Sequence, residues 1–192
     1  SLMQDGITQV SEENTTVYLM DNLEVWKGLY ELEFAGLEDT QAISEMREKI
    51  QAQIEKTFWD DTNQRWRIIG NSDLYHQKDF YPDGVAQIYP LIYEFPVKEK
   101  KKQKILYEQF TERFQWQKLN KKRNGFLWAM TGMAAAQMGD INNLVELIGN
   151  YEAEYCENRK YPLYTGEAGW ICMECEKLYS LYERKIKTGF LV

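Results

Sequence analysis

Apolar residues recur at helical spacing along most of the chain, and the width of the apolar stripe changes from one segment to the next. From Val17 to Ala35 the stripe covers most of the helix surface and leaves a narrow polar strip. From Thr40 to Phe58 a single apolar face is surrounded by charged residues. The pattern therefore predicts a buried helix followed by a surface helix.

This alternation continues to the end of the sequence. Further buried helices are predicted to start near residues 83, 126 and 168, and the segments Val97 to Phe114 and Ile141 to Tyr151 have one apolar face each. Gly36, Pro96 and Gly139 are placed to end the buried helices. We therefore expect an all-α chain of antiparallel helical hairpins, repeated without sequence identity.

The connections between helices alternate between short and long. Links that enter a buried helix are long and aromatic, and the longest runs from Trp59 to Pro82. Within it, a polar turn and the alternating run Arg65 to Ile69 predict a short β-hairpin or irregular insert near residues 60–80. Because successive helices run antiparallel, the long links should share one end of the assembly. That end is the expected working face.

Length and composition fit one folded domain. A chain of 192 residues with 44% apolar content can bury a sizeable core, so we expect residues 1–192 to form a single all-α domain. Residues 1–16 are expected to be a polar tail and linker. Ser1 to Met3 resemble a cloning remnant rather than a signal peptide, because they have no basic region and no apolar core.

Charge, apolar content and cysteine content disfavour several classes of function for this chain. The net charge of -7 disfavours nucleic acid as a partner, and no run approaches the roughly 20 apolar residues that a membrane-spanning helix needs. Cys156, Cys172 and Cys175 are interpreted as structural thiols, with a redox pair or metal site as the alternatives. With one histidine and no second cysteine pair, we expect no metal and no cofactor. Unpaired thiols favour the cytoplasm, and nothing else indicates a location.

Three acidic residues stand near the predicted starts of buried helices. These are Asp21, Asp83 and Glu167, and Glu24 lies one helical turn from Asp21. They are either simple first-turn acids or part of a site. Aromatic rings stack on sugars and carboxylates bind sugar hydroxyls, so a rim of both suits a saccharide. Burial and like charge could raise the pKa of one member of the Asp21 and Glu24 pair and make it an acid.

Three stretches resemble bacterial proteins of the six-hairpin glycosidase superfamily. They are YLMDNLEVWKGL from Tyr18 to Leu29, FYPDGVAQIYPLIYEF from Phe80 to Phe95, and YTGEAGW from Tyr164 to Trp170. The resemblance implies an (α/α)6 toroid. A full toroid has twelve helices and about seven are predicted here, so the chain resembles the carboxy-terminal part of a larger protein.

The resemblance also implies a function and a set of site residues. The function is that of a glycoside-hydrolase-like enzyme, or its carboxy-terminal half, using carboxylate acid and base chemistry. The catalytic candidates are Asp21, Glu24, Asp83 and Glu167. The substrate-binding candidates are Asn22, Trp26, Trp66, Tyr81, Gln87, Tyr164 and Trp170. Related sugar epimerases depend on histidines, and His76 is the only one in this chain.

Two other functions remain open at this point. One is a non-catalytic helical module that binds a saccharide or a protein through the same aromatic rim. The other is a helical-repeat scaffold whose aromatic residues are core. The expected partners are a saccharide and either the missing amino-terminal half of the parent or a second copy of the chain.

Overall fold

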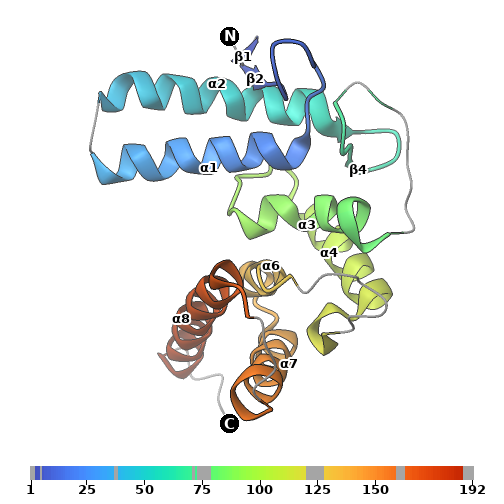
Figure 1. Cartoon of the computed structure of the whole chain (residues 1–192), viewed down its shortest axis with the longest axis vertical. Helices are drawn as coiled ribbons and strands as arrows, with labels where there is room; N and C mark the ends of the chain where they lie inside the picture. Colours follow the sequence, from blue (N-terminus) through green and yellow to red (C-terminus); the bar gives the residue numbers. More distant parts are fainter. Residues whose placement is uncertain are drawn as a thin grey trace. The chain divides into compact units, whose positions relative to one another are not determined.

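The computed structural model describes residues 3–4, 6–36, 39–70, 72, 79–119, 128–158 and 163–187 (Figure 1). Seven α-helices lie within these ranges, with only short strands, so the predicted all-α class is confirmed. The toroid arrangement stays a prediction. The chain divides into two compact units, Ser1–Gln103 and Lys104–Val192, which are described separately. His76 lies outside the described residues.

The first unit is built around a pair of long helices. Its elements are β1 (Met3–Gln4), β2 (Ile7–Thr8), α1 (Leu19–Ala35), α2 (Thr40–Phe58), β3 (Trp59–Asp60), β4 (Arg65–Trp66), the π-helical turn η1 (Phe80–Gly84), α3 (Val85–Ile92) and the first turn of α4 (Lys100–Phe114). α1 ends at Gly36, which has the left-handed φ of 62° that glycine tolerates best. Asp39 caps α2 by accepting hydrogen bonds from the backbone N–H groups of Gln41 and Ala42. Both helix boundaries were predicted from the sequence and are confirmed.

α1 is buried over only part of its length. Its buried residues all lie between Leu19 and Trp26, whereas Tyr30, Leu32 and Phe34 are exposed. The prediction of a helix buried on most sides is therefore wrong for its second half. Figure 1 shows the reason within the first unit, because the far halves of α1 and α2 run side by side and α3 packs near the other end.

The described residues before α1 include a short strand pair, where the sequence analysis expected a polar tail and linker. β1 and β2 form an antiparallel pair in which Met3 is opposite Thr8 and Gln4 is opposite Ile7. Asn22 of α1 joins this pair to the helix. Its Oδ1 accepts hydrogen bonds from the Thr8 backbone N–H at 2.8 Å and hydroxyl at 2.9 Å, and its Nδ2 donates to the carbonyl oxygens of Thr8 and Tyr18.

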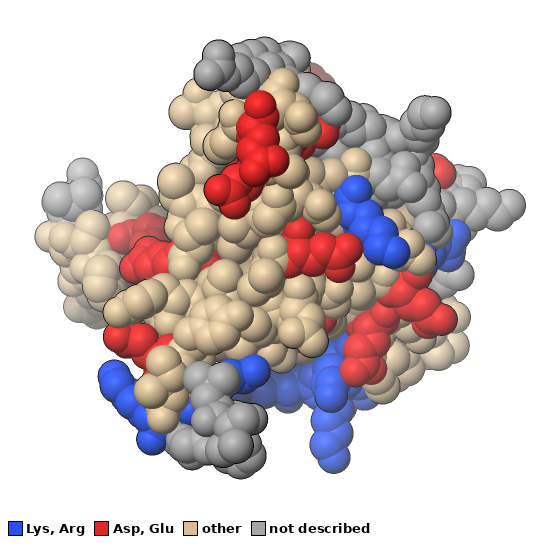
Figure 2. Space-filling view, turned by 90° about the horizontal axis from the view of Figure 1, so that it is seen from below, with Lys and Arg blue, Asp and Glu red and all other residues tan. Residues whose placement is uncertain are grey.

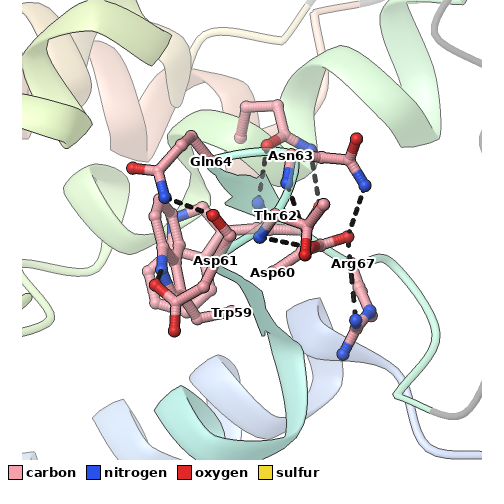
Figure 3. Close-up of polar contacts among 9 residues, drawn as sticks. Trp59, Asp60, Asp61, Thr62, Asn63, Gln64 and Arg67 are labelled. Atoms are coloured by element: carbon pink, nitrogen blue, oxygen red, sulfur yellow. Dashed lines mark hydrogen bonds and ion pairs between the residues drawn. The ribbon is translucent and has the colours of Figure 1, made fainter.

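The predicted insert after α2 is a β-hairpin. β3 pairs antiparallel with β4, and Asp60 organises the turn between them (Figure 3). Its Oδ1 accepts from the backbone N–H groups of Thr62 and Asn63, and its Oδ2 accepts from the Asn63 side chain at 2.9 Å. The Arg67 guanidinium lies 3.7 Å from Oδ2. An aspartate that closes its own turn in this way fixes the direction of both strands.

α3 is the most buried element of the first unit. Seven of its eight residues are buried, and Pro90 lies inside it. The helix ends at Ile92, earlier than the predicted end at Phe95, because Glu94 adopts a left-handed φ of 58°. The backbone N–H of Phe95 then donates to the carbonyl oxygen of Pro90 at 2.8 Å.

The second unit packs three helices against one another. After the rest of α4 its elements are η2 (Trp116–Lys118), α6 (Thr131–Met138), α7 (Ile141–Tyr151), the π-helical η3 (Glu152–Glu157) and α8 (Thr165–Lys187). α6 is buried from Thr131 to Ala136, which confirms a buried helix here, but it begins at Thr131 and the predicted start near residue 126 lies outside the described residues. Gly139 ends it with a left-handed φ of 68°, as the sequence analysis expected, and the Asp140 side chain caps the start of α7.

α8 differs from its prediction in length and in burial. It begins at Thr165, so the GEAGW stretch is helical rather than part of a loop. Only Glu174 is buried along the helix, and Tyr179, Tyr182 and Ile186 are exposed. The prediction of a buried last helix is therefore wrong. Within the second unit α8 packs against α6 and α7, which cover one side of it.

The contact between α6 and α8 depends on a glycine. Gly132 faces the carboxyl group of Glu174, and a Cβ atom added at Gly132 would overlap that group. We expect Gly132→Ala to lower the free energy of unfolding by about 1–3 kcal/mol, because a buried carboxyl and helix backbone must both shift. Urea-induced unfolding followed by circular dichroism measures the change.

Gly149→Ala in α7 is the matched control. Gly149 is exposed and has no other atom within 4 Å of an added Cβ. This change should stabilise the protein by roughly 0.5–1 kcal/mol through helix propensity. Equal effects of the two substitutions would contradict the close approach at Gly132.

Candidate functional site

The predicted acidic residues lie at helix starts. Asp21 is in the first turn of α1, Asp83 in the first turn of η1 and Glu167 in the first turn of α8, as the sequence analysis expected. Asp21 and Glu24 are exposed, Asp83 is buried and Glu167 is half-buried. Asp21 and Asp83 belong to the first unit and Glu167 to the second. The expectation that all three share one rim stays a prediction.

Asp21 and Glu24 form an acidic pair on one face of α1. Partial burial raises the pKa of the Asp21 carboxyl, and a hydrogen bond from its own backbone N–H acts in the opposite direction. The hydroxyl of Tyr89 donates a hydrogen bond to Glu24 at 2.7 Å. The rings of Tyr89 and Tyr93 lie 5.1 Å apart. The pair therefore combines two solvent-reachable carboxyl groups with Tyr89 of α3 and Tyr93, which directly follows α3.

The tyrosines beside Glu24 remain protonated donors. Burial raises the pKa of the Tyr89 phenol, and the hydrogen bond and charge of Glu24 raise it further. The pKa of Tyr93 is raised first by burial and then by the charge of Glu24. A phenol that keeps its proton can go on donating a hydrogen bond to the Glu24 carboxyl group.

Two predicted binding residues hold the fold together instead of lining an open surface. Gln87 binds both backbone polar groups of Trp66, since its Oε1 accepts from the N–H and its Nε2 donates to the carbonyl oxygen, each at 2.9 Å. The Asn22 side-chain amide forms its hydrogen bonds with Thr8 and Tyr18. These contacts give Gln87 and Asn22 structural roles in the first unit.

The predicted aromatic residues divide into buried and exposed sets. Trp26 and Trp66 are only 3% and 2% exposed, so neither ring can stack on a sugar in this structure. Their indole N–H groups donate to Gln51 and Gln103, respectively. Tyr81 and Tyr164 are 50% and 60% exposed, and Trp170 is half-buried. The exposed tyrosines are therefore the predicted aromatic residues most open to a ligand.

In the second unit, Glu167 links α8 to the start of α6. Its Oε2 accepts a hydrogen bond from the Ala129 backbone N–H at 2.9 Å and another from the Tyr151 hydroxyl. Burial raises the pKa of Glu167, while both hydrogen bonds lower it. The side chain thus serves a structural contact, whatever further role it has.

Sequence reasoning missed the most perturbed carboxyl of the second unit. Glu174 lies two turns beyond Glu167 on the same face of α8 and is completely buried. Burial, and then the charge of Glu167, raise its pKa to about 9, although the backbone N–H groups of Gly132 and Met133 act in the opposite direction. A glutamate seven residues after another in a segment predicted to be buried was the signal available in the sequence.

The cysteines do not fill the predicted structural role. Cys156, Cys172 and Cys175 are all unpaired and exposed. Among the residues with described positions, no group of three or more His, Cys, Asp or Glu side chains is arranged to hold a metal ion. Across the same residues, no helix has the length and apolar content needed to cross a membrane.

Acidic residues do not merge into one surface on the face shown in Figure 2. Asp and Glu side chains lie there in several separate groups among uncharged residues.

Comparison of the chain with protein-family models, with curated proteins and with solved structures gives no significant match. The likeness to six-hairpin glycosidases therefore stays a prediction made from three sequence stretches. The functional argument that follows depends on the contacts described above.

The buried Glu174 makes stability depend on pH. Because the pKa of Glu174 is about 9 in the folded protein, against 4.5 for an ordinary glutamate, the folded state holds the proton more tightly than the unfolded state. Stability should therefore fall as pH rises between these values, by up to about 1.4 kcal/mol per pH unit. Glu174→Gln should remove this pH dependence. The free energy of unfolding of the variant should therefore rise relative to that of the wild type as pH increases from 5 to 8.

Urea unfolding at several pH values measures this difference. Glu176→Gln, at an exposed position of the same helix, is the control and should leave the slope unchanged. Parallel pH profiles for the wild type and Glu174→Gln would show that Glu174 is not a buried neutral acid.

Proposed function

We propose that this chain is the saccharide-acting part of a carbohydrate-active protein that cleaves a glycosidic bond. In this proposal Asp21 is the general acid and Glu24 is the second catalytic carboxyl group. The observation that supports it is the pair itself, in which a carboxyl with a raised pKa lies one helical turn from a carboxyl that receives a hydrogen bond from Tyr89.

Glycoside hydrolysis needs one carboxyl group that is protonated and one that is ionised. Partial burial of Asp21 favours its neutral form, which can protonate the leaving oxygen. The Tyr89 hydroxyl holds the Glu24 carboxyl group in place by a hydrogen bond, and in this role Glu24 activates water or attacks the sugar. Both carboxyls are exposed, so a glycan can reach them. The chemistry thus needs no group beyond the side chains on α1 and α3.

The second candidate is a module that binds a saccharide without cleaving it. The contacts of the other catalytic candidates favour this alternative. Glu167 is engaged by Ala129 and Tyr151, and Asp83 is buried at the start of α3. A protein whose carboxyl groups are buried or engaged in structural hydrogen bonds can bind a saccharide through exposed aromatic rings without cleaving it.

Amide substitutions on α1 separate the two candidates. We expect Asp21→Asn and Glu24→Gln each to lower turnover of the responsive glycan by about 100-fold or more, because general acid and base groups contribute about that much. Hydrolysis of a panel of neutral glycans is measured by release of reducing ends. The pH profile of the wild type should lose activity on the alkaline side, where Asp21 loses its proton.

Glu48→Gln, at an exposed position of α2, is the control and should retain full turnover. Thermal unfolding shows whether each variant is folded. Unchanged turnover in folded Asp21→Asn and Glu24→Gln would rule out the assigned roles. Glycan binding without any turnover, in the wild type and in both variants, would favour the non-catalytic module.

A further inference from the structure

A cavity of about 330 Å³ lies beside the β3–β4 hairpin, entirely within the first unit. Its walls come from the end of α2, the hairpin and the segment that leads into α4. The side chains that give it its chemistry are Glu55, Lys56, Trp59, Asp61, Lys98 and Glu99. None of these six was among the site residues predicted from the sequence. The volume falls at the lower end of the roughly 300–1,000 Å³ that is typical of small-molecule sites.

The floor of the cavity is rigid. Trp66 and Gln103 lie there, and both are buried. The indole N–H of Trp66 donates to Gln103 at 2.9 Å, and the Gln103 amide donates to the carbonyl oxygen of Gln87 at 2.7 Å. A site whose base is already ordered loses little conformational entropy when a ligand binds.

Trp59 is held in a fixed orientation on the cavity wall. Its indole N–H donates to Asp61 at 2.8 Å, a contact drawn in Figure 3. Its ring meets Trp66 edge to face at 5.1 Å, and the Lys102 ammonium lies 5.6 Å from the ring centre. The ring is half-buried, so part of it remains open to the cavity. A fixed and partly exposed indole provides an apolar surface for the C–H face of a sugar.

The charges around the cavity balance. Acidic groups come from Glu55, Asp61 and Glu99, and basic groups from Lys56, Lys98 and Lys102. Lys98 forms an ion pair with Glu55, and Lys102 lies 3.1 Å from Glu99. Because the three negative and three positive charges cancel, neither a phosphorylated nor a cationic ligand would meet a net electrostatic attraction. A neutral ligand with many hydroxyls can donate to the acids and accept from the lysines.

We infer that this cavity binds a neutral saccharide of one or two rings, with Trp59 as its stacking surface. The choice of ligand class rests on the proposed function, whereas the location of the site rests on the cavity alone. The site is separate from the Asp21 and Glu24 pair and gives the protein a means of holding a glycan independently of cleavage.

Tryptophan fluorescence and calorimetric titration test the inference. The probes are maltose, cellobiose, xylobiose and N,N′-diacetylchitobiose, with glucose 6-phosphate and glucosamine as charged comparators. At least one neutral disaccharide should bind saturably and more tightly than either comparator. Trp59→Ala should weaken that binding by about tenfold or more, as expected for the loss of a stacking aromatic ring.

Milder variants keep the test independent of folding. Trp59→Phe preserves an aromatic contact with Trp66, and Lys56→Gln changes an exposed side chain; each should weaken binding several-fold. Phe34→Ala removes a ring that is 83% exposed in the same unit and away from the cavity, and Lys100→Gln removes an exposed charge outside it. Both controls should bind the disaccharide as the wild type does.

The outcomes separate this inference from the proposed function. Trp59-dependent binding that persists in Asp21→Asn, with no turnover of any glycan by the wild type, keeps the cavity site and overturns the hydrolase. Turnover that requires Asp21, without Trp59-dependent binding, keeps the hydrolase and overturns the cavity site. Preference for a charged comparator, or equal binding by folded Trp59 variants and wild type, also overturns the inference.

Discussion

The hydrogen bonds that join Trp66, Gln87 and Gln103 organise the first unit. Gln87 holds the backbone of Trp66, while Gln103 receives the Trp66 indole N–H and donates to the Gln87 carbonyl oxygen. One closed set of contacts thus connects the hairpin, α3 and the beginning of α4. Buried polar groups are costly when they lack partners, so these three residues specify one arrangement of the elements around them. Trp66 and Gln103 also form the base of the cavity beside Trp59, so the same hydrogen bonds hold that base in place.

The helices could be predicted from the sequence, but their surroundings could not. Apolar spacing and the helix-ending glycines Gly36 and Gly139 depend on neighbouring residues in the chain, and the structure agrees with them. Burial depends on which other elements pack nearby. Tyr179 and Tyr182 widen the apolar stripe of α8, yet both are exposed because α6 and α7 cover a different side. A wide stripe indicates what a helix is able to bury rather than what it does bury.

In the candidate site, too, features set by neighbouring residues could be predicted, whereas contacts between residues far apart in the sequence could not. The acids were placed at helix starts correctly, since that position follows from the local sequence. The partner of Glu24 is Tyr89, 65 residues away, and no pattern in the chain connects them. In the sequence, Trp59 only marked the start of the longest link, Asp61 belonged to a polar turn, and Glu174 was not singled out. Their chemical environments arise only when separate elements meet, which explains why residues of interest were missed while the helices were found.

The amide of Gln87 has a consequence for self-association. β4 is one strand of a two-stranded sheet, and such edges offer unpaired backbone groups that can recruit a strand from another molecule. Gln87 satisfies both the N–H and the carbonyl oxygen of Trp66, as a neighbouring strand would. The side chain therefore imitates a third strand and ends the ladder. A glutamine on a helix here protects an otherwise adhesive edge from aggregation.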